Sequence, residues 1–120
     1  MKILIVDDSK AMRMIVRRTL RQAGFSGHTV IEATNGVEAL AMIEQESPDV
    51  VLSDWNMPGM KGIELLQKVR GAGIDVRFGF ITSESSGETK QRATDSGADF
   101  LLMKPFTVYS MQAVLEPVLA

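Results

Sequence analysis

Apolar residues along the chain gather in five short runs that alternate with amphipathic stretches. The runs cover residues 3–6, 30–33, 50–52, 76–81 and 100–103, and most are rich in β-branched side chains. Uninterrupted apolar runs of this length are typical of strands that are buried on both faces, as in parallel sheets. The pattern therefore predicts five buried strands.

The stretches between these runs have helical periodicity. In the first, apolar residues recur at three- and four-residue steps from Met12 to Ala23, and Gly24 marks a plausible end. The second opens at Asn35, followed three residues later by Glu38, as in a capping box. We expect its buried residues to be Val37, Leu40, Ala41 and Ile43.

Three further helices are predicted towards the end of the chain. One carries the apolar residues 63, 65, 66 and 69 and ends near Gly71. The next begins near Ser85 or Ser86 and ends at Gly97, and the last spans about residues 107–119. The order is strand then helix, five times over. This order predicts an α/β fold with a doubly wound, five-stranded parallel sheet, (βα)5 and flavodoxin-like, in three layers.

Composition narrows the class of protein. The 120 residues are 45% apolar and 23% charged, with a net charge of −2 and no cysteine. We expect a single domain over residues 1–120 with no effector domain, and the lack of cysteine excludes disulfides within the chain. The basic excess expected of a nucleic-acid surface is missing. No apolar run reaches the roughly 20 residues of a membrane span. We expect a cytoplasmic protein, monomeric or weakly dimeric, that binds neither nucleic acid nor membrane.

Candidate chemistry gathers where the strands end. In such sheets, sites form at the carboxyl ends of the strands, and this rule selects Asp7, Asp8, Asp54, Thr82 and Lys104. Three converging carboxylates repel one another unless a hard cation such as Mg²⁺ joins them. A lysine and a hydroxyl beside them suit an anionic oxygen group. Together these groups favour phosphoryl transfer.

Each of these residues also has an ordinary structural explanation. Asp7 and Asp8 suit the cap of a helix, Asp54 suits a turn, and Thr82 and Lys104 suit a strand end and the surface. These separate explanations require four suitable groups at four strand ends by coincidence. We therefore favour a shared site.

The sequence around these residues resembles response-regulator receiver domains along its whole length. The motifs are Leu4-Ile5-Val6-Asp7-Asp8-Ser9, Ser53-Asp54-Trp55-Asn56-Met57-Pro58-Gly59-Met60, Ile81-Thr82-Ser83 and Lys104-Pro105-Phe106. The resemblance implies that Asp54 takes a phosphoryl group from a phosphohistidine on a histidine kinase. It also implies that Asp8, Asp54 and the Asn56 carbonyl ligate Mg²⁺ or Mn²⁺, with Asp7 acting through water.

The resemblance implies further roles around the phosphoryl group. Lys104 pairs with it or with Asp54, Thr82 turns its hydroxyl onto it, and Ser83 offers a backbone N–H. The Lys104-Pro105 bond is cis in this family. In similar proteins the positions of Asn56 and Glu84 control how fast the acyl phosphate is hydrolysed, because these side chains flank the path of the attacking water.

The last strand and helix depart from the family pattern. Where the family usually has an aromatic switch residue coupled to the threonine, this chain has Leu101, and Phe100 beside it should face the other side of the sheet. The last helix has no lysine. We expect Leu101, Met103 and Met111 to form the output surface. Trp55 should be partly exposed and report on the site.

These features favour a single-domain response regulator in chemotaxis-like two-component signalling. It would phosphorylate and dephosphorylate itself but convert no separate substrate, and it would switch its binding to a downstream protein. A phosphorelay intermediate or phosphate sink is the alternative. A haloacid-dehalogenase-type phosphatase, a flavodoxin-like binding module and a receiver that only binds are three weaker ones. The phosphatase usually has Asp-x-Asp after the first strand and a cap insertion, and this chain has neither.

Overall fold

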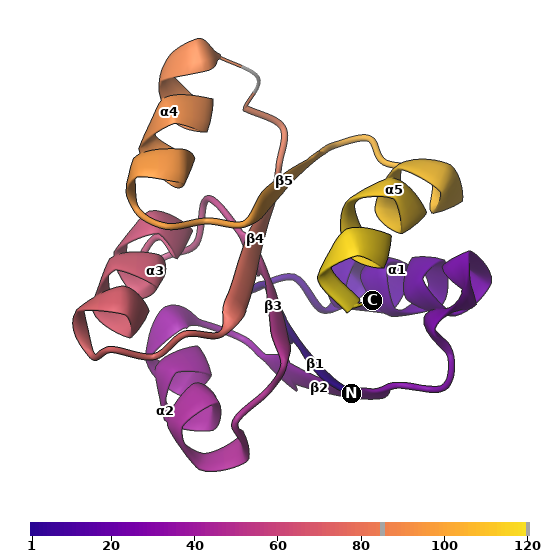
Figure 1. Cartoon of the computed structure of the whole chain (residues 1–120), viewed down its shortest axis with the longest axis horizontal. Coiled ribbons are helices and arrows are strands. Elements are labelled where there is room, and N and C mark those ends of the chain that lie inside the picture. The colour runs from indigo at the N-terminus through magenta and orange to yellow at the C-terminus, as the bar shows by residue number, and fades with distance from the viewer. Residues whose placement is uncertain (85, 120) are drawn as a thin grey trace.

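One sheet of five parallel strands runs through the middle of the molecule (Figure 1). This computed structural model describes residues 1–84 and 86–119. The strands are β1 (Lys2–Val6), β2 (Thr29–Ala33), β3 (Val50–Asp54), β4 (Arg77–Thr82) and β5 (Phe100–Met103). Their order across the sheet is β2-β1-β3-β4-β5. The five predicted strands are all present, with small shifts at their ends, but the edge strands β2 and β5 are only half-buried, so their predicted full burial was wrong.

Helices cover both faces of the sheet. They are α1 (Lys10–Leu20), α2 (Gly36–Glu46), α3 (Gly62–Gly71), α4 (Gly87–Asp95) and α5 (Val108–Leu119), and a π-helical turn, η1 (Arg21–Phe25), continues α1. Figure 1 shows α2, α3 and α4 on one face and α1 and α5 on the other. The predicted doubly wound, three-layer (βα)5 architecture is therefore confirmed.

The alternation of side chains along each strand divides the core between the two faces. In β1, Leu4 packs under the α2–α3–α4 layer with Phe78 and Phe80, whereas Ile3 and Ile5 pack under α1 and α5. These side chains are at most 1% exposed. Strands buried on both faces have apolar residues at successive positions, which explains why the runs were continuous.

The helix boundaries follow local capping chemistry. Asn35 accepts a hydrogen bond from the Glu38 amide at 2.8 Å, and Ser86 accepts one from the Thr89 amide at 3.1 Å. The predicted end at Gly97 is confirmed, with a φ of 96° that only glycine adopts easily. The alternative start at Ser85 lies outside the described residues.

The predicted buried face of α2 was wrong in part. Val37 is 70% exposed and Ala41 is exposed, while the fully buried residues are Gly36, Ala39 and Ile43. The helix starts at Gly36, whose missing side chain leaves room for Met60. Ala39 and Ile43 belong to the core beneath α2, so the 36–39–43 row faces the sheet. Periodicity alone does not distinguish this row from its neighbour.

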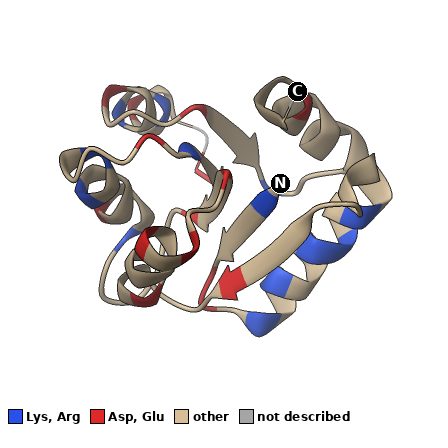
Figure 2. Cartoon of the chain, turned by 60° about the horizontal axis from the view of Figure 1, so that its bottom comes forward, with Lys and Arg blue, Asp and Glu red and all other residues tan. Residues whose placement is uncertain are grey.

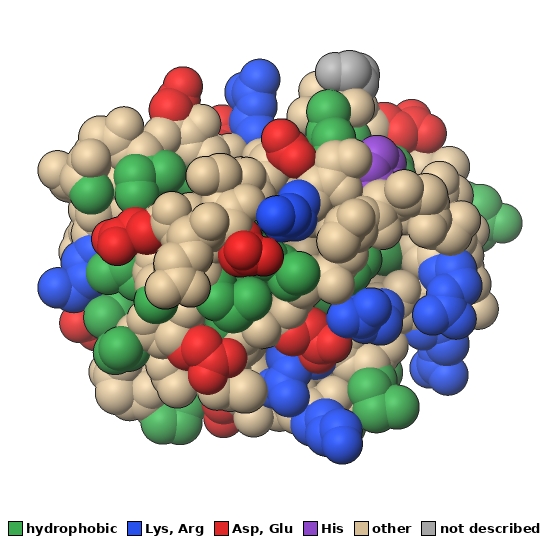
Figure 3. All heavy atoms as spheres, turned by 90° about the horizontal axis from the view of Figure 1, so that it is seen from below, with side chains coloured by type: hydrophobic (Ala, Val, Ile, Leu, Met, Phe, Trp, Pro, Cys, Tyr) green, Lys and Arg blue, Asp and Glu red, His purple; other side chains and the backbone are tan. Residues whose placement is uncertain are grey.

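The edge of the sheet that bears the single histidine has a mixed surface. Figure 3 shows most of the basic side chains of this face gathered on the side of α1, and acidic and apolar side chains over the rest of it. Within the described residues, no helix combines the length and apolar character needed to cross a membrane.

Candidate functional site

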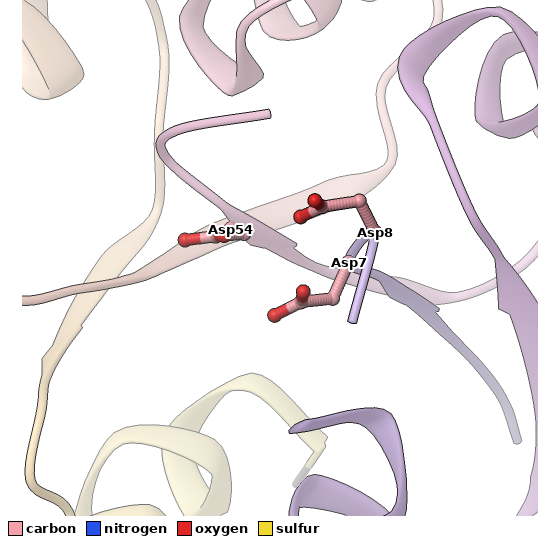
Figure 4. A group of neighbouring side chains, drawn as sticks. All are labelled: Asp7, Asp8 and Asp54. Carbon is pink, nitrogen blue, oxygen red and sulfur yellow. The ribbon is translucent and has the colours of Figure 1, made fainter. Parts of the chain in front are cut away.

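Three aspartates come together at the carboxyl edge of the sheet, as predicted. Asp7 and Asp8 follow β1, and Asp54 ends the neighbouring strand β3, where Val6 pairs with Ser53. One carboxylate oxygen from each lies within 4.8 Å of the others. Figure 4 shows the three side chains extending to the same side of the strand ends. Adjacent parallel strands that end in acids produce this cluster directly.

The three carboxyl groups differ in their environment. Asp7 is only 5% exposed, the Asp54 side chain is 14% exposed, and Asp8 is open to solvent. Burial raises the pKa of Asp7, and the nearby Asp54 and Asp8 charges act in the same direction. A hydrogen bond from the Ser9 amide at 2.8 Å and the charge of Lys104 oppose this rise. The carboxylate of Asp7 is therefore held in a site that disfavours its negative charge.

A divalent cation would relieve this electrostatic strain. The cluster offers three carboxylate oxygens, which are the hard ligands that Mg²⁺ prefers, and its open side at Asp8 leaves space for water or substrate oxygens. The donor set therefore fits a magnesium-type site. Asn56, the predicted backbone ligand, follows Asp54 in an exposed loop, and its role stays a prediction.

Two other predicted site residues lie at the ends of the next strands: Thr82 ends β4, and Lys104 directly follows β5. Lys104 Nζ lies 3.4 Å from Asp54 Oδ1. The Lys104 amide donates to the Thr82 carbonyl at 2.8 Å, which continues the pairing of the two strands. Thr82 is 1% exposed, and its Oγ1 accepts a hydrogen bond from the Glu84 amide at 3.0 Å. The Lys104-Pro105 bond is cis, as expected.

The remaining predicted site residues follow the strands that end in Asp54 and Thr82. Asn56, Ser83 and Glu84 are all exposed, in the loops after β3 and β4. The predicted control of hydrolysis requires side chains that incoming water can meet. Asn56 and Glu84 are exposed, and their control of hydrolysis stays a prediction.

Sequence reasoning missed Gly62, which lies directly behind Asp54. Its amide donates to the Trp55 carbonyl at 3.0 Å, and a Cβ at this position would overlap the Asp54 carbonyl oxygen. The Phe80 ring edge would also lie 2.9 Å from that Cβ. A glycine opening a helix was the available signal, but only the fold shows that the backbone of the candidate nucleophile passes beside it.

The expected partial exposure of Trp55 was wrong. Its side chain is 6% exposed and packs edge-on against Phe80, with ring centroids 4.8 Å apart. The side chain enters the core beneath α2, α3 and α4. A large aromatic residue directly after a buried strand gains more by packing than by extending into solvent. It remains close to Asp54 in sequence and can still report on the site.

The predicted output residues divide into two groups. Leu101 and Met103 are half-buried and line a cavity of about 330 Å³ between α4 and β5, and Phe100 faces the opposite layer as expected. Met111 is fully buried, so its placement on the output surface was wrong. Met111 and Leu115 form the inner row of α5, whereas Tyr109 is 80% exposed.

These features belong to a known class of signalling protein. Residues 3–116 match the response regulator receiver domain family, and the chain belongs to it. The chain is 40% identical to the chemotaxis protein CheY-3 of Vibrio cholerae, over 98% of this chain and 91% of that protein. It is 37% identical to the response regulator MprA of Mycobacterium tuberculosis, over 98% of this chain but 50% of MprA.

Solved structures agree with this assignment. The crystal structure of the Vibrio cholerae chemotaxis protein CheY4 superposes with a TM-score of 0.86 at 38% identity, covering 98% of this chain and 97% of that one. The receiver domain of Francisella response regulator 1452 gives a TM-score of 0.87 at 29% identity, over 98% and 94%. The chain is therefore a CheY-like receiver domain.

Proposed function

We propose that Asp54 accepts a phosphoryl group from a phosphohistidine on a kinase, in a reaction that depends on Mg²⁺. The main support is the convergence on Asp54 of two other carboxylates and the Lys104 ammonium, which lies 3.4 Å from Asp54 Oδ1. The acids offer a cation site and the lysine offers a fixed positive charge. Phosphoryl transfer needs both around its nucleophile.

The reaction exchanges one bond to phosphorus for another. A carboxylate oxygen of Asp54 attacks the phosphorus, a P–O bond forms and the P–N bond of phosphohistidine breaks. The histidine leaves as imidazole and takes a proton from solvent. Asp8, Asp54 and the Asn56 carbonyl would hold Mg²⁺, with Asp7 acting through water. The bound ion would neutralise the phosphoryl oxygens as they approach the acids.

Several residues of the chain then act on the acyl phosphate. Lys104 pairs with a phosphoryl oxygen, the Ser83 amide donates to another, and the Thr82 hydroxyl turns towards the group. Hydrolysis occurs when water attacks phosphorus in line, releasing inorganic phosphate and restoring the Asp54 carboxylate. Asn56 and Glu84 flank this path and set its rate. The protein therefore turns over its own phosphoryl group and no separate substrate.

A downstream protein recognises the phosphorylated state through the surface near α4 and β5. Thr82 and Leu101 lie on adjacent strands and form the switch, and Leu101 and Met103 line the cavity beside α4. A change in their packing alters the binding of a downstream protein. The similarity to CheY-3 favours chemotaxis-like signalling in the cytoplasm by a single-domain regulator. The less favoured alternative is a relay or phosphate sink.

The decisive experiment measures phosphorylation and metal binding on the purified protein. Mg²⁺ and a small phosphoryl donor should give one hydroxylamine-sensitive phosphoryl group by intact mass. Trp55 fluorescence should change with Mg²⁺ and again with beryllofluoride. The matched control, Asp54→Asn, should show no phosphorylation. Equal phosphorylation of this variant, or no response in the parent, contradicts the proposal. Return of the phosphoryl group to a histidine phosphotransfer protein would indicate a relay.

A further inference from the structure

The guanidinium of Arg13 joins three parts of the fold beside the acid cluster. Its NH1 donates to the Asp7 carbonyl oxygen at 2.6 Å, and its Nε donates to Glu32 Oε1 at 2.9 Å. Arg13 belongs to α1 and Glu32 to β2, and the Arg13 side chain is only 11% exposed. Figure 2 shows basic residues spaced along α1, with the acidic residue of the adjacent strand beside them.

The carbonyl that Arg13 holds lies between two of the three candidate metal ligands. It belongs to the planar peptide joining Asp7 to Asp8, so fixing it limits the direction in which the Asp8 side chain leaves the backbone. Two further hydrogen bonds restrain Asp7 itself. The Asp7 amide donates to the Ala33 carbonyl at 3.2 Å, and Asp7 Oδ1 accepts from the Ser9 amide at 2.8 Å.

Glu32 keeps Arg13 in place and partly balances its charge. Glu32 also accepts a hydrogen bond from Arg17 at 2.8 Å. Burial raises the pKa of Glu32, but the hydrogen bonds and charges of Arg17 and Arg13 outweigh burial and lower it. The carboxylate is therefore ionised around neutral pH. A guanidinium so paired repels a nearby cation less than a free one would.

We propose that Arg13, anchored by Glu32, is a positioning residue for the divalent-cation site, because it holds the peptide that orients Asp7 and Asp8. This inference rests on the metal binding in the proposed function. Partners that orient metal ligands without touching the metal commonly change metal affinity by about 10–100-fold. Since Asp8 is exposed and has few other restraints, we expect about a tenfold effect.

The direction in which Mg²⁺ affinity changes distinguishes a positioning role of Arg13 from a purely electrostatic one. Removing a positive charge near three carboxylates should strengthen cation binding by electrostatics alone. Loss of positioning should weaken it. Arg13→Gln is therefore expected to bind Mg²⁺ about tenfold more weakly than the parent. Arg18→Gln is the matched control, because it removes one charge from an exposed position of the same helix and should bind as tightly as the parent or slightly tighter.

The test is Mg²⁺ titration of the purified chain by calorimetry, with thermal unfolding recorded in chelator. Arg13→Gln should lose affinity in excess of any change in metal-free stability. The Ser9 amide should also exchange with solvent faster in this variant, because the turn is held less firmly. Arg13→Lys keeps the charge but loses the guanidinium, which donates to Glu32 and to the Asp7 carbonyl at the same time. It should fall between the parent and Arg13→Gln, and it tests the proposal if the glutamine variant does not fold.

Two outcomes would overturn the inference alone. One is equal or tighter Mg²⁺ binding by Arg13→Gln, or by Arg13→Lys if only that variant folds. The other is an equal loss of affinity in Arg18→Gln. Absence of Mg²⁺ binding in the parent is a third and different result, which would remove the metal step of the proposed function together with this inference.

Discussion

Substitution of Gly62 by alanine should displace the backbone of Asp54, the candidate nucleophile. A Cβ at residue 62 would overlap the Asp54 carbonyl oxygen and lie 2.9 Å from Phe80 Cε1. Phe80 is fully buried and packs against Trp55, so its ring has little room to move away. The structure can accept the methyl group only if α3 and the end of β3 separate.

The expected destabilisation follows from opposing contributions. Overpacking a close-packed site costs about 1–3 kcal/mol, and the backbone carbonyl here places the cost near the upper end. Alanine favours a helix over glycine by up to about 1 kcal/mol, which leaves a net loss of about 2 kcal/mol. The unfolding entropy of 120 residues is about 0.25 kcal/mol/K, so the melting temperature should fall by about 8 °C.

Thermal and urea unfolding followed by circular dichroism would measure this loss. Gly71→Ala is the matched control, since Gly71 ends the same helix, has an ordinary φ, and has no described neighbour within 4 Å of the place that an alanine methyl group would take. It should be stabilised by about 0.4–1 kcal/mol. Because the Asp54 backbone shifts, Gly62→Ala should also be phosphorylated more slowly. Equal stability of the two variants would refute the close approach.

Four other substitutions test the charges and exposed groups of the site. Burial, and then Asp54, raises the pKa of Asp7, so the metal-free parent should lose stability as pH rises through that pKa from the ordinary aspartate range. Asp7→Asn should remove this pH dependence of stability, and in chelator at neutral pH it should be more stable than the parent. Mg²⁺ should stabilise this variant less than it stabilises the parent. If urea unfolding of the variant keeps the same pH dependence, Asp7 is not its source. Lys104→Met should change stability by less than about 1 kcal/mol, because the ion pair is partly exposed, yet it should lose most of the fluorescence response to beryllofluoride. Asn56→Ala and Glu84→Gln should change the dephosphorylation rate while leaving stability within about 0.5 kcal/mol of the parent, as is usual for exposed sites.

The sheet and the acid cluster were predictable because each depends on a strong local signal. A parallel sheet needs continuous apolar runs, and its functional groups gather where those runs stop. Asp7, Asp8 and Asp54 therefore follow from strand ends alone. The capping signal at Asn35 was equally local, since a side-chain oxygen three residues before an amide acts without tertiary contacts.

The failures concern properties that depend on three-dimensional packing. Periodicity predicted α5 but not its rotation about its own axis, so Met111 was placed on the outside of the helix when it is fully buried. The direction taken by Trp55 beyond the end of β3 depends on the space beside Phe80. Gly62 and Arg13 matter because they approach backbone atoms eight and six residues away in sequence, and no periodic pattern encodes such contacts.

The hydrogen bonding of Thr82 limits how strongly its hydroxyl alone could drive a switch. Its Oγ1 accepts from the Glu84 amide, a bond worth about 1 kcal/mol. If the side chain turns towards a phosphoryl group on Asp54, it gains a charge-assisted bond of about 1.5–3 kcal/mol and gives up the first. The difference, about 1 kcal/mol, shifts a population only about fivefold. A larger response needs a second contribution, and Leu101 supplies a place for it, because it lines the cavity of about 330 Å³ between α4 and β5. Repacking of this leucine against α4 can add the apolar burial that the hydroxyl exchange lacks.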